Sequence, residues 1–248
     1  MRIAVIADVH GNLHALRAVA QDMARRSPDL IVNLGDLVSG PFDPAGSADA
    51  QMALGAATLK GNHDRWVLEG PPAGYKDDAR ARATLSEAHL AWMAGLPPTL
   101  SIDGGDVFAC HGSPAGGDLD YLLEDVASGR ALLAAPEAIR PRLAGIGPAR
   151  LVLCGHTHTA RAASLDGVLI VNPGSVGQPA YRDDAPVPHV MEAGTSHALY
   201  AVVERGRLGW SAALCAVPYD HAAAALQAER GGRPDVAHAV RTGRMPPA

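Results

Sequence analysis

Short apolar blocks alternate with segments of helical periodicity along the first half of the chain. Residues 2–8, RIAVIAD, form an apolar run of the length of a buried strand. The segment NLHALRAVAQDMARR follows, and its apolar residues share one helical face: Leu13, Leu16, Val19, Ala20 and Met23. Pro28 ends this helix, because proline lacks the backbone N–H that a continuing helix needs.

Further apolar runs predict more strands, and the segments between them predict helices. The predicted strands are DLIVNLGD (29–36), ATLKGNHD (57–64), VFACHG (107–112), LVLCGHTH (151–158) and GVLIVNPGS (167–175). The predicted helices are a short Ala-rich one after the loop 40–46, one over residues 79–96, and two between VFACHG and LVLCGHTH. Strands that alternate with helices are typical of βαβ units and a mostly parallel sheet.

The pattern changes in the last third of the chain. ALYAVVERGRLGWSAALCAV (198–217) predicts an antiparallel hairpin that turns near Arg205–Gly206. Residues 221–232 and 235–244 predict two small helices that pack on the outside. The C-terminal part therefore adds antiparallel structure to a mostly parallel sheet.

The length of 248 residues and the absence of a repeat or linker favour one mixed α/β domain over residues 1–248. Its motif-bearing core covers about residues 1–180, and the hairpin and small helices occupy 198–248. Apolar residues make up 48% of the chain but aromatic residues only 4%, so Ala, Leu and Val have to fill the core.

Charge and cysteine content exclude several classes of protein. The net charge of −5 and the absence of a Lys/Arg run disfavour long nucleic acids and anionic membranes as partners. The N-terminal apolar stretch is too short for a signal peptide, and no apolar run reaches membrane-spanning length. Cys110, Cys154 and Cys215 lack CxxC spacing, and we expect the first two to be buried apolar fillers. A reducing cytoplasm is the expected location.

Polar clusters follow five of the apolar runs. They contain Asp8 and His10, Asp36, Asn62 to Asp64, His111, and His156 and His158. The carboxyl ends of parallel strands meet at one edge of a sheet, where ligands bind in open α/β folds. We therefore expect all five clusters to converge on one site.

Carboxylate, amide and imidazole groups without thiolate predict divalent metal ions. Asp8 and His10 share a strand face, and so do His156 and His158. Such ligands favour Mn²⁺, Fe²⁺, Co²⁺, Ni²⁺ or Zn²⁺, with Mg²⁺ less well matched. Seven candidate ligands exceed one tetrahedral site and indicate two ions that share a carboxylate, an arrangement common in phosphate-ester hydrolysis. Two carboxylates leave such a pair with surplus positive charge, which attracts phosphate.

Each cluster alone is better explained by a polar turn or a buried, hydrogen-bonded histidine than by a metal site, and only the joint placement of the five favours metal. The stretch GNHD at 61–64 raises the question of whether it is an ordinary polar turn or a set of residues with separate roles. Three consecutive polar side chains cannot share one face of a strand, so the chain has to turn there, and Gly61 allows it to do so. We expect Asn62, His63 and Asp64 to have separate roles.

These motifs resemble those of the calcineurin-like, dinuclear metallophosphoesterase superfamily. Its pattern is D-x-H, G-D, G-N-H-D/E, a lone H and G-H-x-H, and the match here spans about residues 1–180 in the same order. ADVHGNLHAL and VNPGSVGQP resemble its small prokaryotic branch, the YfcE-like phosphodiesterases. The resemblance implies an α/β four-layer sandwich of two mixed β-sheets flanked by helices.

The resemblance also implies a role for each site residue. The first ion would be held by Asp8, His10 and His158, the second by Asn62, His111 and His156, and Asp36 would bridge them. His63 would act on the substrate, stabilising the pentacoordinate phosphorus or protonating the leaving oxygen, and Asp64 would orient its ring. Asn12 would help to bind phosphate, or would simply cap a helix.

The implied function is a metal-dependent phosphoesterase, most consistent with a phosphodiesterase that hydrolyses a small phosphate ester through a metal-bridging hydroxide, with two Mn²⁺ ions as the first choice of cofactor. One alternative is a phosphomonoesterase or nucleotide hydrolase with the same dinuclear site. An alternative of another class is a non-catalytic metal-binding interaction module, as in a retromer subunit of this superfamily whose site has degenerated. No membrane partner is expected, and an oligomer is possible.

Two departures from the family pattern narrow these expectations. GDLVSGP lacks the arginine that G-D-x-x-D-R-G supplies in protein phosphatases, which disfavours that activity. The segment AYRDDAPVPHVMEAGTSH (180–197) intervenes where close relatives run directly into the next strand. We expect its Tyr181 and Arg182 to be solvated loop residues.

Overall fold

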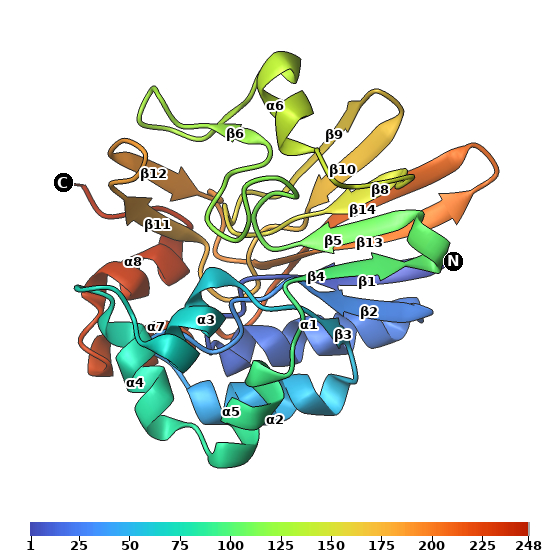
Figure 1. The fold of residues 1–248 in the computed structure, drawn as a ribbon. Helices are drawn as coiled ribbons and strands as arrows, with labels where there is room; N and C mark the ends of the chain where they lie inside the picture. Colours follow the sequence, from blue (N-terminus) through green and yellow to red (C-terminus); the bar gives the residue numbers. More distant parts are fainter. Residues whose placement is uncertain (248) are drawn as a thin grey trace.

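Two five-stranded β-sheets face each other in the computed structural model, which describes residues 1–247 (Figure 1). The first sheet has the strand order β14-β13-β1-β2-β3. Its strands are β1 (Arg2–Ile6), β2 (Leu30–Asn33), β3 (Ala57–Thr58), β13 (Ala198–Gly206) and β14 (Gly209–Val217). Strands β1, β2 and β3 are parallel, whereas β13 is antiparallel to both of its neighbours.

The second sheet has the strand order β4-β5-β8-β10-β9. Its strands are β4 (Thr99–Ile102), β5 (Val107–Cys110), β8 (Leu151–Leu153), β9 (Arg161–Leu165) and β10 (Val168–Asn172), and a 3₁₀ turn at Asp103–Gly105 joins β4 to β5. The three central strands are parallel, and the edge strands β4 and β9 are antiparallel to them. Both sheets are therefore mixed, which confirms the predicted fold class.

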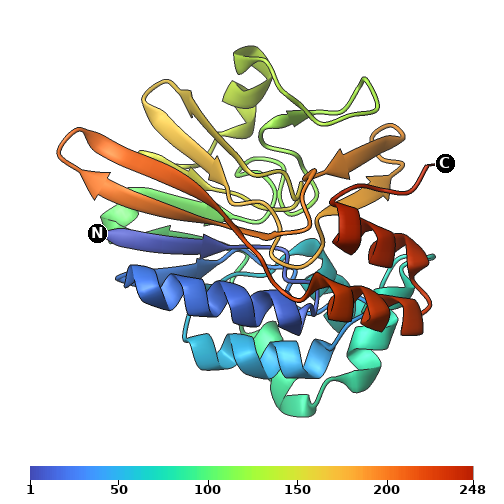
Figure 2. The same cartoon turned by 180° about the vertical axis from the view of Figure 1, so that it is seen from behind.

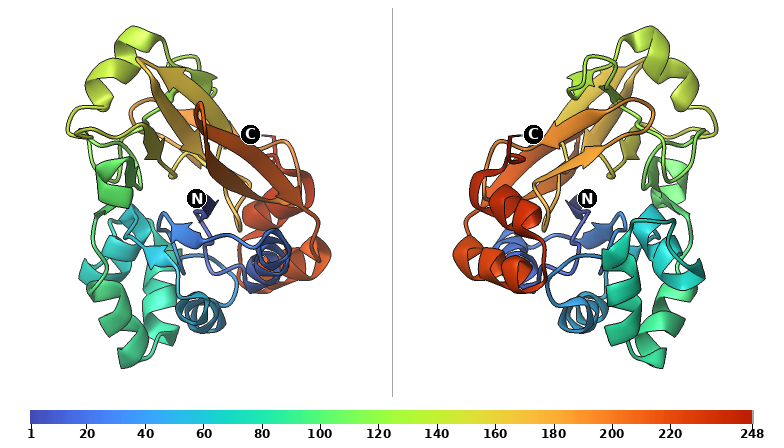
Figure 3. Two further views of the ribbon diagram at one scale, coloured as in Figure 1. Left: turned by 90° about the vertical axis from the view of Figure 1, so that its right-hand side faces the viewer. Right: turned by 90° about the vertical axis from the view of Figure 1, so that its left-hand side faces the viewer.

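Helices cover the outer faces of the two sheets, as the edge-on views of Figure 3 show. Helix α1 (Leu13–Arg26) packs along the first sheet with α2 (Pro44–Leu54) beside it (Figure 2). The helices α3 (Asn62–Glu69), α4 (Lys76–Thr84) and α5 (Glu87–Ala94) extend this layer, and α7 (His221–Arg230) and α8 (Pro234–Thr242) close one end of it. The outer face of the second sheet carries the short α6 (Pro136–Arg142).

Apolar residues of modest size fill the space between the sheets, as the low aromatic content requires. The fully buried side chains there include Ile3, Val5, Val32, Leu34, Val107, Leu151, Leu153 and Val171. Cys110 and Cys154 are buried against α6 and the loops on the far side of the second sheet, which confirms them as apolar fillers. None of the helices in the described part of the chain is long and apolar enough to cross a membrane.

The first helix follows the sequence closely. The Asn12 side chain caps α1 by accepting from the N–H of Ala15, and Ser27 ends it with a φ of 47° just before Pro28. Most of the predicted apolar face is buried, whereas Ala20 is only half-buried. The buried face packs on β1 and β13.

Two element predictions are wrong in detail. The single helix expected over 79–96 is two helices, because Ser86 interrupts it and caps α5 by accepting from the N–H of His89. Only α6 lies where two helices were expected, preceded by the small hairpin of β6 (Glu124–Asp125) and β7 (Leu132–Leu133). The predicted long hairpin is confirmed, and its turn follows Gly206, which pairs with Gly209.

Candidate metal centre

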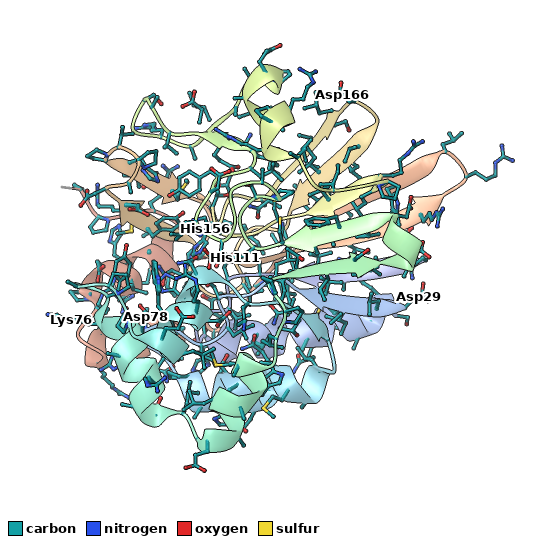
Figure 4. The ribbon with its side chains drawn as sticks, in the orientation of Figure 1. Asp29, Lys76, Asp78, His111, His156 and Asp166 are labelled. Carbon is teal, nitrogen blue, oxygen red and sulfur yellow. The ribbon has the colours of Figure 1, made fainter. Side chains whose placement is uncertain are left out.

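The loops that follow β1, β2, β3, β5 and β8 meet at one end of the two sheets, and they bring all five predicted clusters together. Figure 4 shows His111 and His156 side by side at this end, with their ring centroids 5.2 Å apart. Backbone hydrogen bonds tie the loops to one another: the N–H of Asp8 donates to Gly35, and the N–H of His10 donates to Asp36. The predicted convergence on one site is confirmed, although the clusters follow strands of two sheets and not of one.

The backbone at these loops is held in a conformation that L residues seldom adopt. Eight non-glycine residues among those described have positive φ, and five of them are predicted ligands: Asp8, His10, Asp36, His156 and His158. Such conformations cost free energy and cluster at functional sites, where the surrounding structure enforces them. The loops are therefore shaped to aim these side chains at a common centre.

The first cluster consists of Asp8, His10 and His158, whose ligating atoms lie within 4.8 Å of one another. Nε2 of His10 and Nε2 of His158 are 3.1 Å apart. The opposite ring nitrogens are hydrogen-bonded to backbone carbonyls, Nδ1 of His10 to Ser39 at 2.7 Å and Nδ1 of His158 to Gln178 at 2.6 Å. Since Nδ1 carries the proton in such a bond, both Nε2 atoms offer lone pairs to a metal ion.

The second cluster consists of Asp36, His111 and His156, with Asn62 beside it. Nδ1 of His111 is hydrogen-bonded to the carbonyl of Leu34 at 2.7 Å, so its Nε2 faces inward. This Nε2 lies 3.3 Å from Oδ2 of Asp36 and 3.1 Å from Oδ1 of Asn62. Oδ2 of Asp36 is also 3.8 Å from Nε2 of His10, which places this carboxylate between the two clusters.

Charge and burial together indicate that the clusters are suited to cations. Burial lowers the pKa of His10 to about 4 and that of His156 to about 3, so both imidazoles are neutral ligands at pH 7. Burial acts in the same sense on His111, but the carboxylate of Asp36 outweighs it and raises the pKa to about 10. The negative potential around Asp36 therefore favours positive charge at this point.

Asp8 provides the clearest test of whether the residues fit metal ions. Its side chain is fully buried, and neither of its carboxylate oxygens has a hydrogen-bond partner in the described structure. Burial alone would raise the pKa of Asp8, but the imidazoles of His158 and His111 together outweigh it and hold that pKa below the ordinary value, so the group is ionised. A buried carboxylate without partners is costly unless a cation compensates it. The oxygen and imidazole donors fit divalent ions of the borderline class.

Gly61 is required for a reason other than the one expected. Its φ of −92° is open to any residue, so the turn does not need glycine. A Cβ at this position would lie 2.2 Å from Oδ1 of Asp36, closer than any real contact. The three polar residues also do not end a strand, because helix α3 begins at Asn62. Gly61 therefore allows the helix to approach the carboxylate between the clusters.

The predicted partnership between His63 and Asp64 is wrong. The carboxylate of Asp64 faces away from the ring and accepts from the backbone N–H groups of Asp36, Leu37 and Gly61, at 2.8 to 2.9 Å. Burial, followed by the negative charge of Asp36, raises its pKa to about 7. Asp64 therefore holds the loop that carries Asp36 in place rather than orienting an imidazole.

Asp78 takes the position that was assigned to Asp64. Its Oδ1 accepts from Nδ1 of His63 at 2.8 Å, and its side chain is only 1% exposed. Burial lowers the pKa of His63, but the carboxylates of Asp36 and Asp78 outweigh it and raise that pKa above the ordinary value. Asp78 belongs to no motif, since KDDARARAT reads only as a helix with acidic residues in its first turn. No pattern in the sequence singles it out.

Asn12 is a helix cap in this structure. Its Oδ1 accepts from Ala15, and its Nδ2 donates to the carbonyl of Gly177 and to the hydroxyl of Tyr219. The side chain is fully buried and is not among the residues that line the cleft over the two clusters. The helix-capping alternative therefore accounts for this residue.

The segment 180–197 is not a solvated loop. It contains a hairpin of β11 (Ala180–Asp183) and β12 (His189–Glu192) that lies beside the first metal cluster. The ring of Tyr181 packs against His158 with centroids 4.7 Å apart, and its hydroxyl donates to the carbonyl of His156. Arg182 is exposed, as expected, and donates to the carbonyl of Pro246. Tyr181 therefore forms part of the wall of the site, a role that the sequence did not predict.

A cleft of about 870 Å³ opens above the two clusters. His10, Asp36, Asn62, His156 and His158 lie at its base, and His63 reaches into it. The hairpin β11–β12, helix α3 and the C-terminal residues up to Pro247 form its walls. The cleft provides room for a substrate directly over the candidate metal ligands.

Comparison with known proteins identifies the family. Residues 1–195 match the model of the calcineurin-like phosphoesterase superfamily domain. The chain belongs to this family, as its motifs predicted, and is therefore a metal-dependent hydrolase that acts on phosphoric esters.

Individual proteins are also similar to this chain. Uncharacterized protein MJ0912 of Methanocaldococcus jannaschii is 29% identical over 201 residues, covering 71% of this chain and 76% of the relative. The crystal structure of a metallophosphoesterase from Sphaerobacter thermophilus superposes with a TM-score of 0.73 and 26% identity, covering 98% of this chain and all of the other. Hypothetical protein PH1004 from Pyrococcus horikoshii shares the fold, with a TM-score of 0.76, 18% identity and 99% of each chain covered.

Proposed function

We propose that this chain is a phosphodiesterase that hydrolyses a small phosphodiester with the help of two divalent ions, preferably Mn²⁺. The observation that carries the proposal is the placement of Asp36 between two buried ligand clusters at the base of a cleft. Asp8, His10 and His158 would hold one ion, and Asn62, His111 and His156 the other. Bound ions of this kind neutralise charge on the phosphate and activate water for attack.

The side chains around the clusters would orient the ester and move protons. The ring of His63 lies 5.3 Å from that of His10, and its Nδ1 is held by Asp78, which leaves Nε2 as the nitrogen free to protonate the departing alcohol. The backbone N–H of His63 donates to Oδ1 of Asp36, so the backbone that carries this ring is held against the carboxylate between the two clusters. Tyr181 closes the opposite side of the site against His158.

Preference for a diester over a monoester follows from the surroundings of the clusters. A monoester carries a second negative charge, which protein phosphatases meet with the arginine that GDLVSGP lacks. Ser39 and not a cation lines the cleft from this segment. The cleft volume of about 870 Å³ is large enough for two ester groups. The resemblance of ADVHGNLHAL and VNPGSVGQP to YfcE-like phosphodiesterases supports the same choice.

The test compares bis-p-nitrophenyl phosphate with p-nitrophenyl phosphate, using protein stripped of metal and reconstituted with Mn²⁺. We expect kcat/KM for the diester to exceed that for the monoester by at least about tenfold, and no turnover of either in chelator. Parallel reconstitution with Co²⁺, Ni²⁺, Zn²⁺ and Mg²⁺ ranks the metals. Equal activity in chelator would show that hydrolysis does not require metal. A preference for the monoester would favour the phosphomonoesterase alternative.

A further inference from the structure

The walls of the cleft carry more negative than positive charge above the metal clusters. Apart from Asp36 at the base, the acidic residues that line the cleft are Asp77, Asp120, Glu124, Asp125, Asp183 and Asp235. Three arginines and no lysine line it within the described chain. Asp125 and Asp183 have no ion-pair partner within 4.0 Å among residues 1–247. An additional anionic group of a substrate would therefore meet repulsion here.

The three arginines of the lining are already engaged. Arg233 pairs with Asp77 and donates to both oxygens of Asp235, which joins α4 to α8. Arg142 donates to three backbone carbonyls of the loop over residues 121–124. Arg182 reaches the carbonyl of Pro246 at the rim. Each of these arginines would have to break its present hydrogen bonds in order to bind a second phosphate.

Aromatic and aliphatic side chains make up much of the remaining wall. The ring centroids of Trp66 and Tyr75 are 4.6 Å apart, and Trp66 lies 4.8 Å from His63. Tyr75 is 40% exposed, so part of its ring is open to a ligand. Leu119 and Val187 line the cleft and are 52% and 37% exposed. These surfaces contact flat, uncharged groups well, through stacking and apolar burial.

We propose that the substrate is a phosphodiester with a single phosphate, whose second ester group is planar and uncharged, and that the cleft selects against a second phosphate. The inference rests on the proposed function and names the substrate class for the same site. The reacting phosphate would lie over the clusters, and the planar group would extend toward Trp66 and Tyr75. A second phosphate on that group would face the unpaired Asp125 and Asp183.

Two chromogenic diesters that differ by one phosphate test the proposal. They are the p-nitrophenyl ester of thymidine 5′-phosphate and the same compound with an additional 3′-phosphate; both release p-nitrophenolate from the same nucleoside. With the Mn²⁺ enzyme, we expect kcat/KM to be at least about tenfold higher for the compound without the 3′-phosphate. Raising the salt concentration should narrow this ratio, because screening weakens the repulsion.

Substitutions test whether Asp125 and Asp183 cause the discrimination against the second phosphate. The double variant Asp125→Asn with Asp183→Asn preserves the acceptor oxygens that bond Ala127 and Ala185 and removes the charges, so the ratio should move toward one. Asp29→Asn is the matched control: Asp29 lies at the far end of the strands from His111 and His156 (Figure 4), and the ratio should stay unchanged. Arg182→Ala should also leave the preference in place.

The outcomes distinguish failure of the proposed substrate class from failure of the proposed phosphodiesterase function. Equal rates on the two nucleoside compounds, a preference for the one with the 3′-phosphate, or loss of that preference in Arg182→Ala would overturn the substrate class and leave the phosphodiesterase intact. Failure to hydrolyse bis-p-nitrophenyl phosphate with metal present would overturn the proposed function, and the substrate class with it.

Discussion

Asp78 accepts a hydrogen bond from Nδ1 of His63 at 2.8 Å, although it lies fifteen residues further along the chain and on a different helix. The pair is formed by the packing of α4 against α3, and the adjacent Asp64 takes no part in it. A carboxylate in this position fixes the imidazole and leaves Nε2 directed at other partners.

Replacing Asp78 should impair catalysis without loss of metal. Asp78→Asn retains an oxygen that can accept from Nδ1 but loses the charge, whereas Asp78→Ala loses both. We expect kcat on a phosphodiester to fall moderately in the first variant and about a hundredfold in the second, because the ring is then free to rotate. Kinetics combined with metal analysis checks this. Equal effects of the two variants, or loss of bound metal, would show that Asp78 has only a structural role.

His63→Ala should slow turnover by roughly 10²- to 10⁴-fold, the range of general-acid contributions, with both metals retained. The deficit should be larger for a diester with an alkyl leaving group than for one that releases p-nitrophenolate, since a good leaving group needs little protonation. Paired kcat values for the two substrates, with metal content measured on the same preparations, test this. An equal loss of kcat on both substrates would indicate that His63 binds the phosphate instead. Loss of bound metal would indicate that His63 is a metal ligand.

Gly61→Ala should abolish activity because it disrupts the metal centre. The new Cβ would be placed 2.2 Å from Oδ1 of Asp36, so the carboxylate or the start of α3 has to move. Gly95→Ala is a suitable control, because its φ of −74° is ordinary and the nearest atom lies 3.5 Å from the new Cβ. Metal content and activity should fall in the first variant and remain normal in the second. A fully active Gly61→Ala enzyme would contradict the close approach.

Removing the metal should destabilise the fold, because the buried carboxylates of Asp8 and Asp36 lose the divalent ions that would compensate them, and Asp8 has no hydrogen-bond partner among the described residues. Each ion at about a hundred times its dissociation constant contributes about 2.7 kcal/mol. For two ions this corresponds to a melting temperature roughly 10–20 °C lower in chelator. Thermal melts with chelator and after Mn²⁺ is restored measure this. The Asp8→Asn variant should respond much less, and an unchanged melting temperature in the parent protein would argue against buried ions.

The order of elements and the identity of the candidate ligands could be predicted from the sequence for a local reason. Buried strands are short apolar runs, and the residues that follow neighbouring parallel strands lie at the same edge of a sheet. The sequence alone is therefore enough to place Asp8 near Asp36, and His111 near His156, whereas the meeting of these two pairs depends on how the two sheets pack. The same reasoning identified the long hairpin, because its alternation and its turn are close in sequence. We propose that the chain is one domain, since β13 of that hairpin pairs directly with β1.

The tertiary structure alone decided which neighbours the side chains have. Asp78 reaches His63, and Tyr181 reaches His158, through helix and hairpin packing that no periodicity describes. Gly61 is explained only by how closely α3 approaches Asp36. Local patterns specify where a residue lies along its own strand or helix. The distance between two segments depends on how their side chains pack, and this determines the partner of the imidazole and the charge and shape of the cleft.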